Sequence, residues 1–115
     1  MESTETATPG KVIIAPEVLI TIAKLATLSV PGVANMAAVP GGMDRYFKRG
    51  TADGVRIHMR ENSLSADLYV VVRGEANART VSEAVQAEVA RAMSEMVGLE
   101  TSAVNVHIED IAFVE

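Results

Sequence analysis

Two histidines, His58 and His107, are the residues of this sequence best suited to chemistry, and Glu109 follows the second at a spacing of two. Imidazole and carboxylate groups bind metals and exchange protons near neutral pH, so the three could form a metal site or an acid–base group if their strands were neighbours. The alternative is a pair of half-exposed strand histidines. We favour that alternative because the sequence contains no HExxH helix, no third convergent set of ligands and no nucleophile beside a base.

The residue types that are missing or scarce narrow the chemistry further. Cysteine is absent, which excludes disulfides, thiolate metal sites and thiol nucleophiles. Gly41 and Gly42 stand together, but the phosphate-binding patterns GxxxxGK(S/T) and GxGxxG are both missing. Aromatic residues make up only 3% of the chain, which leaves little for the walls of a cofactor pocket. We therefore expect a protein without enzyme activity, cofactor or bound metal.

A basic and aromatic segment lies between Pro40 and Gly54, the longest irregular stretch of the sequence. Connections of this length are commonly functional or mobile. One interpretation is a solvated loop with a single aromatic side chain resting on the core, and the other is a contact surface for a protein partner. Five residues of this segment and two from the open face of the predicted sheet form the predicted partner-binding set: Arg45, Tyr46, Phe47, Lys48, Arg49, Tyr69 and His107.

The segment Arg79–Val97 is predicted to be the helix around which the chain folds. Its apolar residues recur at steps of three and four, which is typical of a helix with one buried face. Three stretches of alternating apolar residues, Val55–Met59, Leu64–Val72 and Val104–Ile108, are predicted to be the strands that cover this face. The residues predicted to be buried on the helix are Val81, Val85, Val89, Ala92, Met93 and Met96.

The remaining elements follow from local signals. We expect a short strand at Val12–Ile14, a helix that begins at Pro16 and ends at Pro31-Gly32, and a strand over Val33–Val39. The strands around residues 55 and 64 form a hairpin that turns at Asn62-Ser63, and its outer face, which includes Tyr69, remains open to water.

Capping and alternation define the second half of the chain. Asn77 or Thr80 caps the main helix, and Gly98 ends it. The last strand buries Val104, Val106 and Ile108, and its alternation breaks at Asp110, which indicates a bulge or the end of the strand. The prediction is a single α+β domain of order β-α-β-β-β-α-β, with both helices on one face of a small sheet.

Charge is distributed unevenly along the chain. The net charge is −5, with an isoelectric point near 5.0. Residues 45–60 nevertheless hold five of the ten basic residues against one acid, Asp53, whereas residues 75–115 hold two arginines against eight acids. The basic segment raises nucleic-acid binding as a less favoured hypothesis, since the overall acidity opposes it. The separation of basic and acidic regions also suggests head-to-tail self-association into a homo-oligomer. The alternative is an ordinary solvated dipole.

The first ten residues, MESTETATPG, are polar and lack the apolar core of a signal peptide. No run approaches the roughly 20 apolar residues of a membrane span. We expect a disordered tail over residues 1–10 and one domain over residues 11–115. The protein should be cytoplasmic and should reach the membrane only peripherally, through a partner.

Four stretches stand in a distinctive order and spacing: VIIAPEVLITIAKLATLSVPGV, PGGMDRYFKRGTADGVRI, ADLYVVVRG and GLETSAVNVHIEDIAF. Together they resemble the alkaline-shock-protein envelope stress response family over about residues 11–114. The resemblance implies a small non-enzymatic α+β domain of the bacterial cytoplasm, linked to stress tolerance and to the cell envelope. In some relatives such a domain is held at the membrane by a separate anchoring protein and forms higher-order assemblies.

The resemblance leads us to expect a protein–protein adaptor in envelope stress response or homeostasis. A regulatory or accessory subunit of a soluble enzyme is the alternative. The family supplies no catalytic motif to transfer, and a loop made more aromatic by Tyr46 and Phe47 leaves the choice of partner open.

Overall fold

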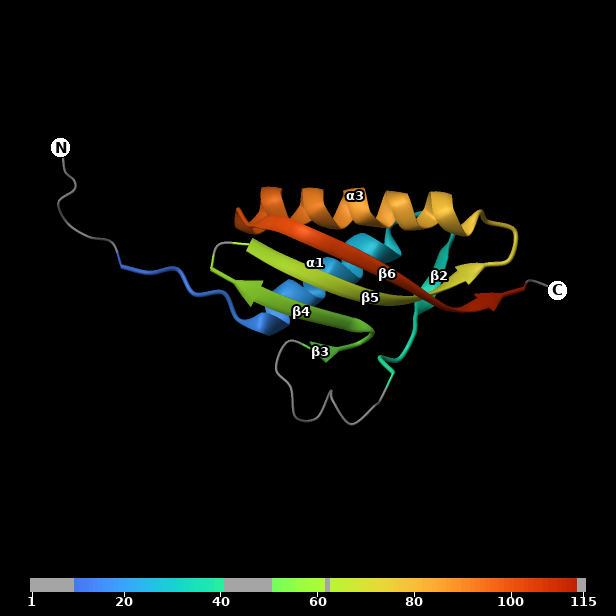
Figure 1. Ribbon diagram of the computed structural model, residues 1–115, viewed down its shortest axis with the longest axis horizontal. Helices are drawn as coiled ribbons and strands as arrows, with labels where there is room; N and C mark the ends of the chain where they lie inside the picture. The colour runs from blue at the N-terminus through green and yellow to red at the C-terminus, as the bar shows by residue number, and fades with distance from the viewer. Residues whose placement is uncertain (1–9, 41–50, 62, 114–115) are drawn as a thin grey trace.

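The computed structural model describes residues 10–40, 51–61 and 63–113 of the chain. Within these residues the chain forms two helices and a five-stranded sheet, which confirms the predicted α+β class. In order, the elements are α1 (Pro16–Leu28), β2 (Val33–Met36), β3 (Thr51–Ala52), β4 (Val55–Arg60), β5 (Ser63–Arg73), α3 (Ala78–Val97) and β6 (Glu100–Ala112) (Figure 1).

Strand β5 is the centre of the sheet. On one edge it pairs antiparallel with β4 over Ser63–Leu68, as the predicted hairpin requires, and then with β2 over Val70–Val72. On the other edge it pairs with β6 along its whole length, and this pairing is parallel. A parallel neighbour requires a long crossover connection, and α3 provides it.

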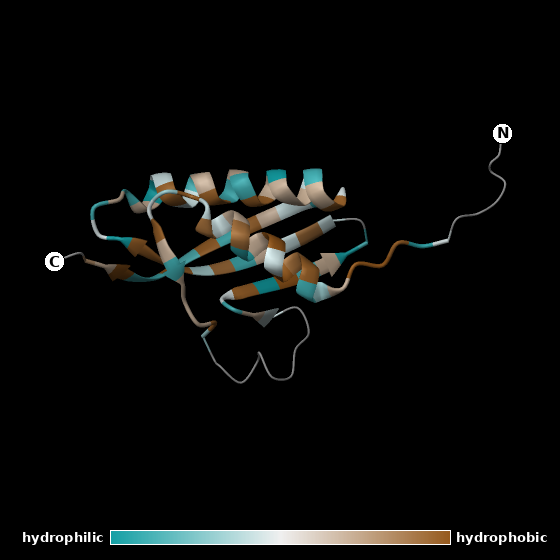
Figure 2. Ribbon diagram, turned by 180° about the vertical axis from the view of Figure 1, so that it is seen from behind, coloured by the Kyte–Doolittle hydropathy of each residue, from teal (hydrophilic) through white to brown (hydrophobic). Residues whose placement is uncertain are grey.

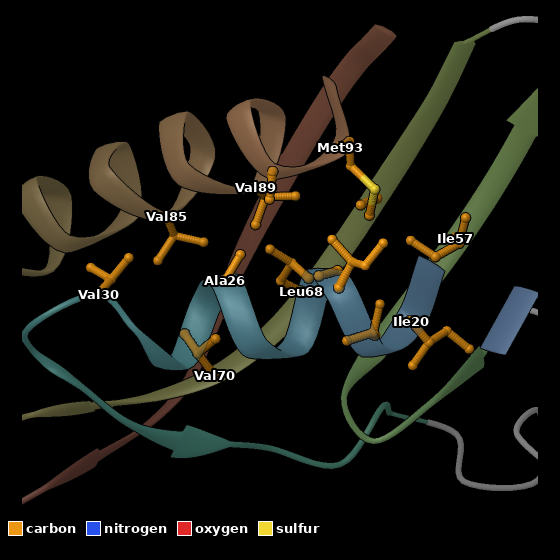
Figure 3. Close-up of a cluster of buried hydrophobic side chains, with 14 of the residues drawn as sticks. Ile20, Ala26, Val30, Ile57, Leu68, Val70, Val85, Val89 and Met93 are labelled. Atoms are coloured by element: carbon orange, nitrogen blue, oxygen red, sulfur yellow. The ribbon is translucent and has the colours of Figure 1, made fainter. Parts of the chain in front are cut away.

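Both helices cover one face of the sheet, as predicted (Figures 1 and 2). Alternate residues of β5 point towards the helices and are fully or almost fully buried: Leu64, Ala66, Leu68, Val70 and Val72. From α3, Val85, Val89 and Met93 point back into the same core (Figure 3). Every second residue of the strand and every third or fourth residue of the helix therefore pack together in one apolar layer.

Helix α1 begins at Pro16, whose missing N–H costs nothing in the first turn. At its other end, the hydroxyl of Ser29 donates to the carbonyl of Ala26 at 2.7 Å. The chain then turns at Gly32, which has φ +100° and approaches α3 so closely that a Cβ there would lie 2.5 Å from Cγ2 of Val81. A glycine is therefore needed between α1 and β2.

Helix α3 is capped as the sequence indicates. Of the two predicted caps, Asn77 is the one used, and its side chain accepts from the backbone N–H of Thr80 at 3.0 Å. Gly98 ends the helix in the left-handed conformation, with φ 69°. Of the six residues predicted to be buried, Met96 is the exception, with 67% of its surface exposed. It lies in the last turn and lines an open groove beside α1, where no described element covers it.

Two other predictions require correction. Residues 12–14 do not form a strand: Val12 and Ile13 are 89% and 84% exposed, in an arm that runs away from the sheet (Figure 1). A β-rich composition has no effect without a neighbouring strand to pair with. The predicted burial of Ile108 is also wrong, because β6 lies at an edge of the sheet and leaves this residue exposed.

The break in alternation near Asp110 is a β-bulge, one of the two outcomes predicted. Ile108 lies opposite Val70, but Asp110 lies opposite Val71, so Glu109 is the extra residue. Such an insertion changes the direction in which the following side chains point.

Candidate functional site

The open face of the sheet, on the side away from the helices, carries a compact group of polar and aromatic side chains. Cross-strand pairing places Arg56 beside Asp67, Asp67 beside Asn105, and Tyr69 beside His107. His58 lies two residues after Arg56 and therefore shares the same face. We refer to these six residues as the open-face cluster: Arg56, His58, Asp67, Tyr69, Asn105 and His107.

Asp67 is at the centre of this cluster. One carboxylate oxygen, Oδ1, lies 3.0 Å from Nε2 of His107 and accepts from Nδ2 of Asn105 at 3.1 Å. The other, Oδ2, lies 3.7 Å from Nε2 of His58. Each histidine comes from a different strand, β4 or β6, so β5 holds a carboxylate between two imidazoles.

The surroundings of Asp67 hold it in the ionised form. Its side chain is only 20% exposed, and this burial by itself raises the pKa of the carboxyl. Hydrogen bonds with His107 and Asn105 and the charges of both histidines act in the opposite direction. The net effect is a pKa below the usual value of 3.8, because the hydrogen bonds favour the charged carboxylate.

Tyr69 is the aromatic support of the cluster. Its ring stacks on that of His107, with centroids 4.4 Å apart and planes 12° from parallel. The guanidinium carbon of Arg56 lies 5.8 Å from the tyrosine ring centroid, within the range of a cation–π contact. These neighbours leave Tyr69 only 6% exposed, which corrects the prediction of a residue open to water.

The backbone of Tyr69 is fixed where β4 and β2 meet alongside β5. Its N–H donates to the carbonyl of Gly54 at 2.9 Å, and its carbonyl accepts from the N–H of Ala37 at 2.7 Å. Gly54 has φ +81°, and a Cβ there would lie 2.4 Å from the carbonyl oxygen of Ala37. The aromatic support therefore rests on a tightly packed junction of three strands.

The structure brings together the two histidines that the sequence singled out, but not Glu109. Glu109 is the bulged residue of β6, and in the described part of the chain no hydrogen bond or ion pair joins it to His58 or His107. Among residues 10–40, 51–61 and 63–113, no group of three or more His, Cys, Asp or Glu side chains is arranged to hold a metal ion. The cluster is therefore described best as an ordered polar surface.

The predicted partner-binding residues divide into two groups. Tyr69 and His107 belong to the open-face cluster and contact each other. The other five lie outside the described residues and stay a prediction: Arg45, Tyr46, Phe47, Lys48 and Arg49.

Sequence reasoning did not select Asp67, Arg56 or Asn105 as site residues. Alternation places Asp67 and Arg56 on the outer face of the hairpin, and this signal was available. Asn105 joins them only because β6 pairs with β5, which no local pattern specifies.

Comparison with known proteins connects this fold to a family. The sequence profile of the alkaline shock protein 23 family, described as having a cell envelope-related function, matches residues 4–113. The chain belongs to this alkaline shock protein family. Its membership confirms the resemblance inferred from the four sequence stretches.

Relatives of this chain occur in Bacillus subtilis and Streptococcus pyogenes. Uncharacterized protein YqhY of Bacillus subtilis is 33% identical over 106 residues, covering 90% of this chain and 78% of the relative. Uncharacterized protein Spy1535 of Streptococcus pyogenes is 34% identical over 103 residues, covering 89% and 79%.

Solved structures of similar shape include MamM CTD. One of them superposes with a TM-score of 0.58 at 22% identity, covering 82% of this chain and 94% of MamM CTD. At this identity the likeness shows a shared fold alone. Neither α1 nor α3 is long and apolar enough to cross a membrane.

Proposed function

We propose that this alkaline shock protein family domain is a non-enzymatic adaptor that binds a protein partner through its open sheet face, in a bacterial process related to the cell envelope. The observation that carries the proposal is the contrast between the two faces of the sheet. One face is buried beneath both helices, while the open-face cluster is covered by no described helix or strand. Exposed and ordered side chains of this kind are typical of binding surfaces.

The cluster is ordered before any partner arrives. Stacking fixes the ring of His107 on Tyr69, and hydrogen bonds fix Asp67 between its neighbours. A surface whose side chains are already held loses less conformational entropy on binding. Tyr69 is buried beneath the accessible side chains and would act on binding through the ring of His107 that it supports.

The accessible parts of the cluster define the kind of partner that would fit. The side chains of His58 and His107 are 60% and 40% exposed, whereas that of Asp67 is 20% exposed. A partner would therefore meet mainly the edges of the two imidazoles, around a recessed carboxylate and above a buried tyrosine ring. A flat protein surface with hydrogen-bonding groups fits this arrangement better than a deep small-molecule ligand. The cell envelope-related description of the family favours a membrane-anchoring protein as that partner.

The proposal is tested by adding one charge to either side of the molecule. His58→Glu introduces an acid on the open face, and Ala87→Glu introduces the same acid at an exposed site of α3. Ala87→Glu should melt close to the parent, because its site is exposed. His58→Glu should melt somewhat lower, because it places a second carboxylate beside Asp67, and circular dichroism shows that it remains folded. In affinity purification from separated membranes and cytosol, we expect His58→Glu to lose most of the partner and Ala87→Glu to retain it.

The membrane and cytosol fractions also distinguish an adaptor from the alternative, a regulatory subunit of a soluble enzyme. An envelope anchor should be recovered from the membranes, whereas a soluble enzyme recovered from the cytosol would favour a regulatory subunit. Equal recovery of the partner with both variants would contradict the open face as the contact surface.

A further inference from the structure

Helix α1 is apolar on its outer side as well as on its buried side. Its outward stripe includes Val18, Leu25 and Leu28, which are 45%, 61% and 37% exposed. With Thr21 these residues follow a spacing of three, four and three, which is the seam of a helix that packs against another helix. We call these four residues the α1 stripe. A helix with apolar residues on two sides normally has a neighbour on each.

Thr21 does not interrupt the stripe. Its hydroxyl donates to the backbone carbonyl of Glu17 at 2.9 Å, within the same helix. A contact at this position would therefore bury no unsatisfied donor.

An open groove lies beside the first half of the stripe. It has a volume of about 500 Å³ and is lined by Glu17, Val18, Thr21 and Ile22 from α1 and by Met96 and Val97 from α3. The exposed Met96 side chain forms one wall. The groove offers a hole for an apolar side chain from a partner helix, as knobs-into-holes packing requires.

Charge shows which helix fits. Glu17 and Lys24 flank the stripe seven residues apart, an acid near its start and a base near its end. Lys24 is partly exposed and makes a long contact of 3.8 Å with Asp53. When two identical helices pack antiparallel, the acid of each can approach the base of the other. The stripe is therefore complementary to a second copy of itself.

The arm before α1 fits the same arrangement. Val12 and Ile13 are almost fully exposed and precede the start of the helix. Figure 2 shows the segment before α1 leaving the domain, with a hydrophobic stretch along it. In an antiparallel pair this arm runs past the end of the partner helix, where Leu28 of the second copy is exposed. One contact would thus cover two sets of apolar residues that this chain leaves open.

We infer that two copies of this chain form a two-fold dimer by packing their α1 helices antiparallel. The axis passes close to Thr21, Val18 faces Leu25 of the second copy, and that leucine enters the groove beside Met96. An interface of this kind is isologous, so it closes at two subunits. It uses the helical side of the molecule and does not depend on the proposed binding to the open face.

Sedimentation velocity of the purified chain tests this dimer. The expected mass is twice the 12.2 kDa of one chain, and the double variant Val18→Asp/Leu25→Asp should sediment at 12.2 kDa. The matched control, Ala84→Asp/Ala87→Asp, places two acids at exposed sites of α3 and should stay dimeric. Circular dichroism confirms that each variant is folded. If the parent chain remains monomeric up to millimolar concentration, the proposal is wrong, and the α1 stripe would have to bind a different protein.

Two further variants test the antiparallel arrangement. Glu17→Lys and Lys24→Glu should each raise the dissociation constant by about 3- to 10-fold, and the double exchange should restore it. Since the natural chain has no cysteine, Thr21→Cys should also give a cross-linked dimer with a short bis-maleimide, whereas Ala87→Cys should not. An equal yield at both positions contradicts a two-fold axis near Thr21.

Salt distinguishes this dimer from the head-to-tail assembly suggested by the charge distribution. Apolar helix packing should persist when salt is raised, because screening weakens exposed charge pairs and leaves apolar contacts intact. An assembly that dissociates in high salt and is unchanged by Val18→Asp/Leu25→Asp contradicts the α1 interface.

Discussion

Asp67 holds a carboxylate between histidines from two different strands, and this position determines how the open face responds to pH. Its pKa is lowered in the folded protein, although burial alone would raise it, because hydrogen bonds with His107 and Asn105 favour the ionised form. A group with a lowered folded pKa stabilises the fold at pH values above its unfolded pKa. That contribution is lost as pH falls through the folded pKa.

We predict that Asp67→Asn lowers the free energy of unfolding by about 1–2 kcal/mol near neutral pH, since it removes a hydrogen-bonded charge while keeping the size of the side chain. Below about pH 4 the carboxyl of the parent becomes protonated in the unfolded state and then in the folded state, so the difference should shrink. Urea unfolding of parent and variant at about pH 6 and about pH 3 measures both values. A difference that stays constant across this range contradicts the role assigned to the charge.

The residues of the open-face cluster show which side-chain positions can be predicted from the sequence. Alternation placed Tyr69 and His107 on the outer face, and their contact confirms that placement. The central role of Asp67 was not foreseen, because its hydrogen-bond partners come from β6, about forty positions away in the sequence. Pairing between distant strands depends on the tertiary fold, so no local spacing reveals it.

At the level of elements, α3 was the most predictable. Its three-to-four apolar spacing, the asparagine cap and the terminal glycine are local signals, and each is present in the structure. Met96 breaks the pattern because an open groove separates the last turn of α3 from the first turns of α1. Burial at a helix end thus depends on how closely a neighbouring element packs there, which the helix's own sequence does not encode.

The buried face of α3 gives a direct test of stability. Val89 is fully buried against the sheet, so Val89→Asp should place an unpaired charge in apolar surroundings and cost several kcal/mol. Most of the roughly 5–15 kcal/mol that stabilises a domain would then be lost. Ala87→Asp, at an exposed site of the same helix, should cost below about 1 kcal/mol. Equal melting temperatures for the two variants would mean that the buried face is assigned wrongly.

Elements without strong local signals were predicted less well. The apolar run Val12–Ile14 resembles a strand in composition, but it finds no partner strand among the described residues. Val12 and Ile13 remain exposed, and only Ile14 packs against the core. Strand β3 has only two residues, too few for any periodic pattern. The parallel direction of β6 follows from the path of α3 across the sheet, and a strand's own sequence does not record its direction.

The molecule as a whole has two exposed surfaces on opposite sides of one core. The open-face cluster lies on the sheet, and the α1 stripe lies on the helical layer. Because the proposed dimer uses the α1 stripe, the groove beside it and the arm before α1, it would leave an open face on each subunit. Two binding faces in one particle would increase the effective affinity for a partner that is itself clustered, as at a membrane, without any additional contact.

Family membership extends over nearly the whole chain, since the alkaline shock protein profile matches residues 4–113. Its cell envelope-related description agrees with the expectation drawn from the sequence. The role of adaptor depends on whether a partner lies on the open face.

Photo-cross-linking from a single position tests most directly whether a partner lies on the open face. A benzophenone amino acid at position 58 places the probe on the open face, and the same amino acid at position 87 places it on the exposed side of α3. Irradiated in cells, the first chain should form one dominant adduct with a protein of the membrane fraction, and the second should not form that adduct. An adduct of equal yield from both positions, or one from position 87 alone, would contradict the open sheet face as the surface through which this domain acts.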